Sequence, residues 1–428
     1  MNNIHLKSPK GWINDPNGFI YYKGKYHMFY QHFPYAPQWG RMHWGHAVSD
    51  DLTNWEHLNI ALFPTKTDDS DGCFSGSAVE HNGKMHLFYT GVHYTEPDPE
   101  NTNCNLNDGF ISAQLHISSD DGYTFDNFSN KSTIIPPINK SEIGDMTHTR
   151  DPKVWQGKDG NWYMVLGSTV DHVGRVLFYR SSDLINWKYV NYASCNDMGW
   201  MWECPDYFET DGRGVLIFSP MDDEKGNQSV CTLAEFNEEN GNMKICENFQ
   251  YIDYGLDLYA PQSTMDKDGR RVVVAWLRMP EPMENNVIGM FCIPRICEVK
   301  NDHIYFHPHS DITQKFTVKT NMPDMKDPFM IKAKLNENEQ ISIGGYIIRY
   351  ENGRIITDRN AVIREHNELK NICETPELKG CVSLEIYVDR NIVEVFINNG
   401  EYVITNTVYD MTDEIICNKN TEFYVLEE

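Results

Sequence analysis

The feature that most constrains this fold is a repeat of five similar segments in the first two thirds of the chain. Each segment is a glycine turn followed by a run of residues typical of a β-strand. The turn glycines are Gly24, Gly83, Gly160, Gly212 and Gly269, with a mean spacing of about 61 residues. Periods of tens of residues, built from short strands and glycine turns, are typical of propeller blades. The repeat therefore predicts an all-β protein with a five-bladed β-propeller.

The remainder of the chain has a different pattern. Alternating runs at residues 341–350, 382–388 and 392–397 are separated by turns that include Asn352-Gly353 and Asn399-Gly400. This pattern is typical of an antiparallel β-sandwich. A chain of 428 residues is also too long for one hydrophobic core of usual size. We therefore expect a propeller domain over residues 1–310 and a C-terminal β-sandwich domain over residues 311–428.

Three carboxylates occupy equivalent places in the repeat. Asp15, Asp151 and Glu203 each precede their turn glycine by nine residues, and Ser75 and Tyr259 precede theirs by eight and ten. If each glycine turn joins the first two strands of a blade, these residues begin the innermost strands, which line the central channel. The motif around Asp15 alone is also typical of an Asx turn. A purely structural repeat, however, needs no acid at three equivalent places, so we expect the five residues to meet at one mouth of the channel.

Clustered carboxylates in a cleft the size of a sugar suit glycosidic hydrolysis. One carboxylate attacks the anomeric carbon or activates water, and a second, protonated carboxyl donates to the leaving oxygen. A third can hold hydroxyl groups close to the developing positive charge.

Several sequence blocks match glycoside hydrolase family 32, the invertase and fructan hydrolase family. The chain resembles this family over essentially its whole length, and its segment from Leu384 to Phe396 looks like part of the family's C-terminal β-sandwich. The matching blocks are Trp12 to Gly18, Tyr26 to Gln31, Trp39-Gly40, His43 to Ala47, Phe74 to Ala78, Arg150 to Pro152, Trp202 to Asp206 and Tyr259 to Gln262.

This resemblance implies a role for each matching position. Asp15 is expected to be the nucleophile, Glu203 the general acid/base, and Asp151 the stabiliser of the transition state. The substrate-binding positions that it implies are Asn14, Gln31, Trp39, Phe74, Ser75, Arg150, Tyr259 and Trp276. The family commonly has an aromatic residue and then Asn-Pro after Gln31, where this chain has His32-Phe33-Pro34. That departure concerns contacts to the leaving group.

Electrostatics adds two expectations for the site. Arg150 is next to Asp151 in sequence and is expected to keep that carboxylate ionised. Glu203 is expected to hold its proton near neutral pH through repulsion from Asp15.

Charge and cysteine usage restrict the partners and the location. A formal net charge of −25 disfavours nucleic acid and anionic membranes as partners. The resemblance to family 32 implies a small carbohydrate substrate. Self-association into a homo-oligomer stays open. No apolar run approaches the roughly 20 residues of a membrane span. Eleven cysteines without a framework spacing, and no recognisable export signal, indicate reduced thiols and a cytoplasmic location.

We expect no metal and no cofactor. His303, His307 and His309 lie near Cys292 and Cys297, but their spacing fits no common zinc pattern, which favours structural roles. Cys204, beside Glu203, is interpreted as a packing residue.

The sequence therefore predicts a retaining glycoside hydrolase that cleaves terminal β-D-fructofuranosides by double displacement. Sucrose, sucrose 6-phosphate and short fructo-oligosaccharides all remain as substrates. A phosphate on the leaving sugar would need a basic pocket, for which Arg41 is the local candidate. A solvated loop position is the favoured interpretation of Arg41, so we expect unphosphorylated β-fructosides to be the main substrates. The alternatives are a propeller glycosidase that acts on another furanoside, of the arabinan type, and a non-catalytic sugar-binding propeller.

Overall fold

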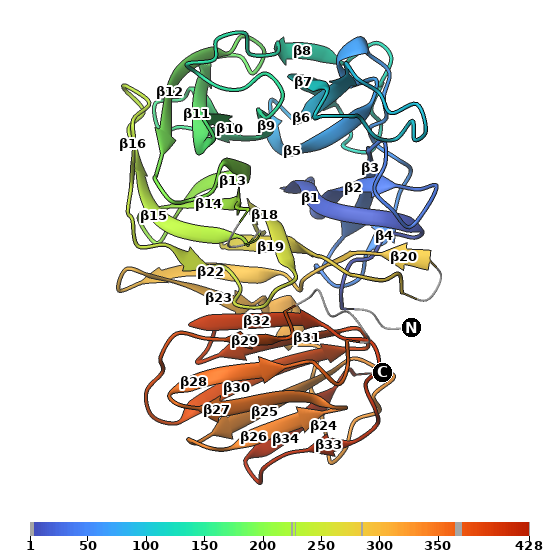
Figure 1. The fold of residues 1–428 in the computed structure, drawn as a ribbon, viewed down its shortest axis with the longest axis vertical. Coiled ribbons are helices and arrows are strands. Elements are labelled where there is room, and N and C mark those ends of the chain that lie inside the picture. The colour runs from blue at the N-terminus through green and yellow to red at the C-terminus, as the bar shows by residue number, and fades with distance from the viewer. Residues whose placement is uncertain (1–3, 224–225, 227, 284–285, 364–369, 428) are drawn as a thin grey trace.

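The computed structural model describes residues 4–223, 226, 228–283, 286–363 and 370–427. The N-terminal part of the chain forms five antiparallel sheets arranged around a centre, and the C-terminal part forms two more sheets stacked beneath them (Figure 1). The predicted fold class, a β-propeller followed by an antiparallel β-sandwich, is confirmed. None of the helices in the described part is long and apolar enough to span a membrane.

The five sheets of the propeller follow one another along the chain. The first contains β1 (Gly11–Tyr22), β2 (Lys25–Phe33), β3 (His43–Ser49), β4 (Glu56–His57) and β20 (Val287–Ile288). The second contains β5 (Gly72–His81), β6 (Lys84–Tyr94), β7 (Phe110–Ser119) and β8 (Ser132–Ile135), and the third β9 (Arg150–Gln156), β10 (Trp162–Val170), β11 (Val173–Ser181) and β12 (Lys188–Ser194). The fourth contains β13 (Met201–Thr210), β14 (Arg213–Met221), β15 (Val230–Phe236), β16 (Met243–Ile245) and β17 (Gln250–Tyr251). The fifth contains β18 (Leu258–Met265), β19 (Arg271–Leu277), β21 (Met290–Phe291), β22 (Arg295–Lys300) and β23 (His303–Pro308).

The turn between the first two strands of each sheet is the glycine turn of the repeat. All five of these glycines have a positive φ, between 73° and 87°, which a side chain would disfavour. In the turns Asn82-Gly83 and Asp211-Gly212 both residues have positive φ, as the tight two-residue hairpin turn requires. The repeat therefore marks hairpins whose first strand is the innermost strand of its sheet.

The innermost strands contact one another in a closed ring, in the order β1, β5, β9, β13, β18 and back to β1. A belt of hydrogen bonds made by side chains joins each neighbouring pair. Its five bonds are Gly76 N to Asn17 Oδ1 (3.2 Å), Val154 N to Ser77 Oγ (3.1 Å), Lys153 Nζ to Asp206 Oδ2 (2.8 Å), Ser263 N to Asp206 Oδ2 (2.7 Å) and Phe19 N to Gln262 Oε1 (2.8 Å). We call this set the inner belt. The parallel pairing of β20 with β1 further ties the last sheet to the first.

The C-terminal part is a sandwich of two antiparallel sheets. One contains β24 (Val318–Thr320), β34 (Thr421–Val425), β25 (Phe329–Leu335), β30 (Val382–Asp389), β31 (Ile392–Ile397) and β32 (Tyr402–Thr407). The other contains β29 (Ile372–Glu374), β28 (Arg354–Asp358), β27 (Tyr346–Glu351), β26 (Gln340–Ile343) and β33 (Ile415–Ile416). The short helices η1 (Thr67–Asp69) and α1 (Ser310–Thr313) lie outside the sheets.

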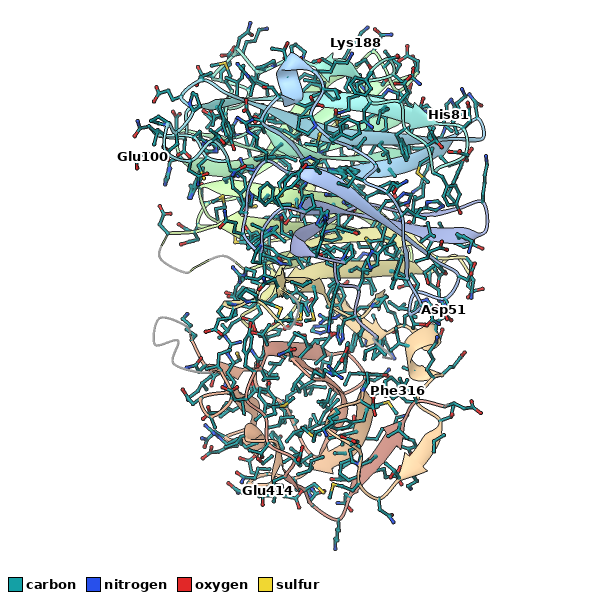
Figure 2. All side chains as sticks on the ribbon, turned by 90° about the vertical axis from the view of Figure 1, so that its right-hand side faces the viewer. Asp51, His81, Glu100, Lys188, Phe316 and Glu414 are labelled. Atoms are coloured by element: carbon teal, nitrogen blue, oxygen red, sulfur yellow. The ribbon has the colours of Figure 1, made fainter. Side chains whose placement is uncertain are left out.

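The sandwich is joined to the propeller by an apolar core. Strand β31 is buried at all six positions, although a strand with one face in water would alternate. One face of its sheet packs within the sandwich, and the other packs on propeller residues such as Ile304 and Phe306. Phe316, labelled in Figure 2, belongs to this core at the junction.

A buried ionic network crosses the same junction. Arg295, on β22, donates to Asp253 Oδ2 (2.8 Å) and to Glu394 Oε2 (2.6 Å). His5 lies 2.8 Å from Glu394 Oε1 through Nε2 and 2.8 Å from Asp389 Oδ2 through Nδ1. These side chains are at most 1% exposed, so each charge depends on its partner.

Arg295→Met should therefore destabilise the protein strongly, because it leaves the buried Asp253 without its cation and deprives Glu394 of its guanidinium partner. We expect a loss of about 3–5 kcal/mol in the free energy of unfolding, measured by urea denaturation at pH 7. The control is Lys319→Met, which removes an exposed ion pair to Glu422 and should cost at most about 1 kcal/mol. A loss below about 1 kcal/mol for Arg295→Met would contradict the role of the network.

Candidate active site

Each innermost strand contains a β-bulge at the place where the sequence puts a functional residue. The pairing register shifts between Ile13 and Pro16 in β1, between Cys73 and Gly76 in β5, between Arg150 and Lys153 in β9, between Glu203 and Asp206 in β13, and between Tyr259 and Gln262 in β18. A bulge redirects the side chains of a strand. Asp151, Cys204 and Ala260, inside three of these bulges, have positive φ values of 66°, 47° and 51°. Such conformations are costly for residues other than glycine and cluster at functional sites.

Asp15 is held by two neighbours. Ser75 Oγ donates to Asp15 Oδ2 at 2.5 Å, and Asn14 Nδ2 donates to Asp15 Oδ1 at 3.0 Å. Asn14 in turn accepts a hydrogen bond from Trp12 Nε1 at 2.7 Å. Burial raises the pKa of Asp15, while the hydrogen bonds from Ser75 and Asn14 oppose that effect.

Cys204 connects Asp15 to Asp151. Its sulfur lies 3.5 Å from Asp15 Oδ2 and 3.6 Å from Asp151 Oδ2, and its backbone N–H donates to Asp151 Oδ2 at 2.9 Å. Burial, together with the carboxylates of Asp15 and Asp151, raises the pKa of the thiol well above its usual range. The thiol therefore keeps its proton and donates to the carboxylates, so the packing role expected from the sequence is incomplete.

Glu203 is held from both sides. Arg150 donates to Glu203 Oε1 through Nη2 at 2.7 Å and through Nε at 3.2 Å. The hydroxyl of Tyr259 donates to Glu203 Oε2 at 2.5 Å. Burial raises the pKa of Tyr259 well above its usual range, so this hydroxyl keeps its proton.

Arg150 acts to lower the pKa of Asp151, as expected, but burial outweighs this effect. The guanidinium of Arg150 is hydrogen-bonded to Glu203, which lies on the adjacent innermost strand, β13. The bulge in β9 turns the side chain of Asp151 away from Arg150 and toward Cys204. Burial raises the pKa of Asp151 to about 7, although the charge of Arg150 acts to lower it. Thr90 Oγ1 accepts the backbone N–H of Asp151 at 2.9 Å and fixes the strand there.

The structure thus brings together seven of the predicted site residues through hydrogen bonds and the Cys204 thiol. They are Asn14, Asp15, Ser75, Arg150, Asp151, Glu203 and Tyr259.

The other four predicted residues lie on neighbouring elements. Gln31, on β2, is buried and donates to the Cys73 carbonyl at 3.0 Å. Trp39 packs edge to face on Phe74, with ring centroids 6.0 Å apart. Trp276 packs on Trp12 at 5.8 Å, and its buried Nε1–H has no hydrogen-bond partner among the described residues. An unpartnered buried donor is uncommon in a folded protein.

Sequence reasoning did not select Trp12, Thr90 and His148 as site residues. Trp12 orients Asn14, Thr90 fixes Asp151, and His148 Nδ1 lies 3.3 Å from Arg150 Nη1. Trp12 and His148 lie within three residues of Asp15 and Asp151 in the sequence, and this proximity could have identified them. Thr90 is on β6 and has no such signal.

No group of three or more His, Cys, Asp or Glu side chains in the described part is placed to hold a metal ion. His309 is bonded to Asp266 and Arg270, His307 to Glu298, and His303 to the Glu401 carbonyl.

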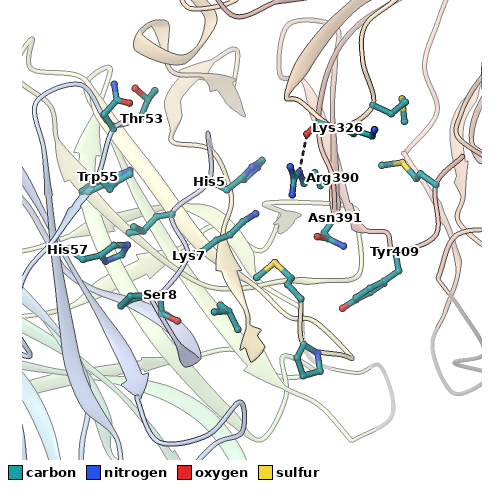
Figure 3. Close-up of a pocket in the computed structure, with 18 of the residues that line it drawn as sticks. His5, Lys7, Ser8, Thr53, Trp55, His57, Lys326, Arg390, Asn391 and Tyr409 are labelled. Carbon is teal, nitrogen blue, oxygen red and sulfur yellow. Dashed lines mark hydrogen bonds between the residues drawn. The ribbon is translucent and has the colours of Figure 1, made fainter. Parts of the chain in front are cut away.

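One large cavity of the described part is separate from the carboxylates. It is a groove of about 1190 Å³ between the propeller and the sandwich, lined by residues such as His57, Lys326 and Tyr409 (Figure 3). None of the eleven predicted site residues lines it, so its size alone does not locate the site.

Comparisons with known proteins agree on one family. The chain matches the model of the glycosyl hydrolases family 32 N-terminal domain over residues 5–308 and that of the family 32 C-terminal domain over residues 302–424. It is 33% identical to a sucrose-6-phosphate hydrolase of Zymomonas mobilis, with 98% of this chain and 87% of the relative covered. It is also 33% identical to a raffinose invertase of Escherichia coli, with coverage of 96% and 90%.

Solved structures show the same architecture. A Bombyx mori family 32 β-fructofuranosidase, solved as a mutant in complex with sucrose, is 30% identical and superimposes with a TM-score of 0.83. The comparison covers 100% of this chain and 94% of that one. A sucrose-6-phosphate hydrolase of Lactobacillus gasseri, 24% identical, has the same fold with a TM-score of 0.87 and coverage of 100% and 93%.

The pKa of Asp151 makes a prediction about stability. The folded protein keeps a proton on Asp151 up to a pH of about 7, whereas the unfolded chain releases it near 3.8. The free-energy cost of ionising Asp151 in the folded protein is therefore absent below pH 3.8. It grows as the pH rises and reaches at most about 4 kcal/mol above pH 7. Asp151→Asn removes this cost, so it should stabilise the protein at pH 8 and have little effect at pH 4.

Urea denaturation at pH 4, 6 and 8 measures this difference. The control is Asp120→Asn, whose side chain is 83% exposed and should change stability equally at each pH. A gain for Asp151→Asn that does not increase with pH would contradict the raised pKa.

Proposed function

The chain belongs to glycoside hydrolase family 32, and we propose that it is a retaining enzyme that releases terminal β-D-fructofuranosyl units by double displacement, with Asp15 as nucleophile. The observation that carries this proposal is the meeting of three carboxylates from three sheets around Cys204 and Arg150. Its relatives are named sucrose-6-phosphate hydrolase and raffinose invertase, so the chain is a hydrolase of β-fructofuranosides. These names do not favour an arabinan-type glycosidase or a non-catalytic sugar-binding propeller.

In the first step Asp15 attacks the anomeric carbon of the fructosyl unit. Ser75 and Asn14 hold its two oxygens, so one orientation of the carboxylate is fixed before the substrate arrives. Glu203 donates a proton to the glycosidic oxygen as the bond to the leaving sugar breaks. The product is a fructosyl ester on Asp15.

In the second step Glu203 takes a proton from water, which attacks the anomeric carbon and releases fructose and free Asp15. Arg150 and Tyr259 fix Glu203 in both steps. A tyrosine hydroxyl donates to a carboxylate and accepts from a carboxylic acid, so its contact persists when the proton moves. The two inversions restore the original anomeric configuration.

Asp151 is proposed to bind fructose hydroxyl groups and to stabilise the oxocarbenium-like transition state. Trp276 is a further proposed contact, because its unpartnered Nε1–H can donate to a sugar hydroxyl. The remaining proposed contacts are Asn14, Gln31, Trp39, Phe74, Ser75, Arg150 and Tyr259.

Sucrose 6-phosphate is a second substrate to consider, since several relatives are named for it. Arg41, the local candidate for a phosphate contact, forms an ion pair with Asp71 at 3.0 Å. That pairing favours the unphosphorylated fructosides as the main substrates.

We also propose a propeller catalytic domain over residues 1–310 and a supporting sandwich over residues 311–428. A cytoplasmic location is proposed because all eleven cysteines are free thiols, as a reducing compartment keeps them.

Glu203→Gln tests the acid role. With sucrose, whose leaving group needs a proton, the rate should fall by about 10²–10⁴. With an activated fructoside such as p-nitrophenyl β-fructofuranoside, the formation of the fructosyl-enzyme, measured as a burst, should fall far less. Glu209→Gln, on the same strand and half exposed, is the matched control and should leave both rates unchanged. Equal losses on both substrates would contradict the role of Glu203.

A further inference from the structure

A second cavity, of about 520 Å³, opens at the same end of the propeller as the carboxylates. In β10, Gly167 pairs with Arg150, so residues 169–172, which line the cavity, lie beyond the start of β9. In β14, Ser219 pairs with Glu203, and Asp223 likewise lies beyond it. The cavity is therefore built from loops at the mouth of the channel, outside the carboxylate cluster.

An aromatic wall leads from Glu203 into this cavity. Arg150, which holds Glu203, lies 3.3 Å from His148 Nδ1 through Nη1. The ring of Trp200 meets His148 edge to face at 5.1 Å and stacks on His172 at 5.4 Å, with an interplanar angle of 7°. The backbone N–H of Trp200 donates to the Met221 carbonyl at 2.9 Å, so the wall is fixed to the strand pair that positions Glu203.

The chemistry of the proposed reaction places the leaving sugar here. Glu203 delivers its proton to the glycosidic oxygen, so the leaving sugar must lie next to Glu203 and away from Asp15, which attacks from the opposite face. His148, which lines the cavity, lies 3.3 Å from Arg150 Nη1, and Arg150 in turn holds Glu203. The volume of the cavity is in the range of small-ligand sites, and aromatic walls with a few polar groups are typical of them.

The charge of the cavity indicates which leaving groups it accepts. Four carboxylates line it, from Asp108, Asp145, Asp171 and Asp223, and no Lys or Arg does so among the described residues. Asp145 is partly engaged, because it accepts the backbone N–H groups of Thr147 and His148. A phosphate dianion placed among these groups would be repelled, whereas neutral hydroxyl groups can donate hydrogen bonds to them.

We propose that the cavity walled by His148, His172 and Trp200 binds the leaving sugar, and that its carboxylates select neutral β-fructosides, from sucrose to raffinose-type oligosaccharides, over phosphorylated ones. This inference rests on the proposed function, since it places the leaving group by the role of Glu203.

Trp200→Ala tests the binding of the leaving sugar. For raffinose, kcat/KM should fall at least tenfold, because the stacking surface is lost. For methyl β-fructofuranoside, which has no leaving sugar, kcat/KM should change less than twofold, and Trp200→Phe should restore most of the raffinose activity. The control is Phe128→Ala, which removes an aromatic ring that is 71% exposed and lies outside this cavity. Equal losses on both substrates, or no loss on raffinose, would overturn the assignment.

Phosphorylated sucrose tests the selection by charge. The wild type should have a kcat/KM at least tenfold higher for sucrose than for sucrose 6-phosphate. The double variant Asp108→Asn/Asp171→Asn should reduce this ratio at least threefold, whereas Arg41→Ala should leave it unchanged. A wild-type preference for the phosphate ester, or a ratio unaffected by the double variant, would overturn the charge argument.

The two proposals fail in different ways. If the proposed function is wrong, methyl β-fructofuranoside is not hydrolysed by the wild type. If only the assignment of this cavity is wrong, methyl β-fructofuranoside and sucrose are hydrolysed, but the variants of Trp200 and of the cavity carboxylates do not discriminate among leaving groups.

Discussion

The inner belt is the interaction on which the remaining structure depends. Five sheets meet along their innermost strands, and the belt joins every neighbouring pair there. Lys153 and Asp206 supply its charged bond, and both are almost fully buried. In each innermost strand the belt residue follows directly after the bulge. The belt therefore fixes the position of each bulge along the channel and the orientation of its side chains relative to the other bulges.

The bulges turn this ring of strands into a site. Asp151 and Cys204 adopt left-handed backbone conformations that cost of order 1–3 kcal/mol each. Burial of Asp15 and Asp151 adds an electrostatic cost. Stability is therefore lost at the catalytic end of the channel, while the belt below it, the apolar junction with the sandwich and the Arg295 network stabilise the fold.

Much of this arrangement is predictable from the sequence, because the glycine turns are local. Their spacing places Asp15, Asp151 and Glu203 on equivalent strands, and the structure brings these residues together. The partner of Arg150 is not predictable in this way. It depends on the bulge in β9, which directs the side chains of Arg150 and Asp151 to different partners. Arg150 thereby reaches Glu203 on the adjacent strand. The burial of both faces of β31 likewise depends on the packing of the sandwich against the propeller. The alternation of polar and apolar residues within one strand does not predict that packing.

We propose that Asp15 and Glu203 act from opposite faces of the fructosyl unit, as nucleophile and acid/base. Proton NMR of a sucrose digest, recorded before mutarotation, tests it most directly. Double displacement predicts that the first fructose released is the β-furanose, with the configuration of the substrate. Release of α-fructofuranose first would show direct attack by water and would contradict the account of Asp15.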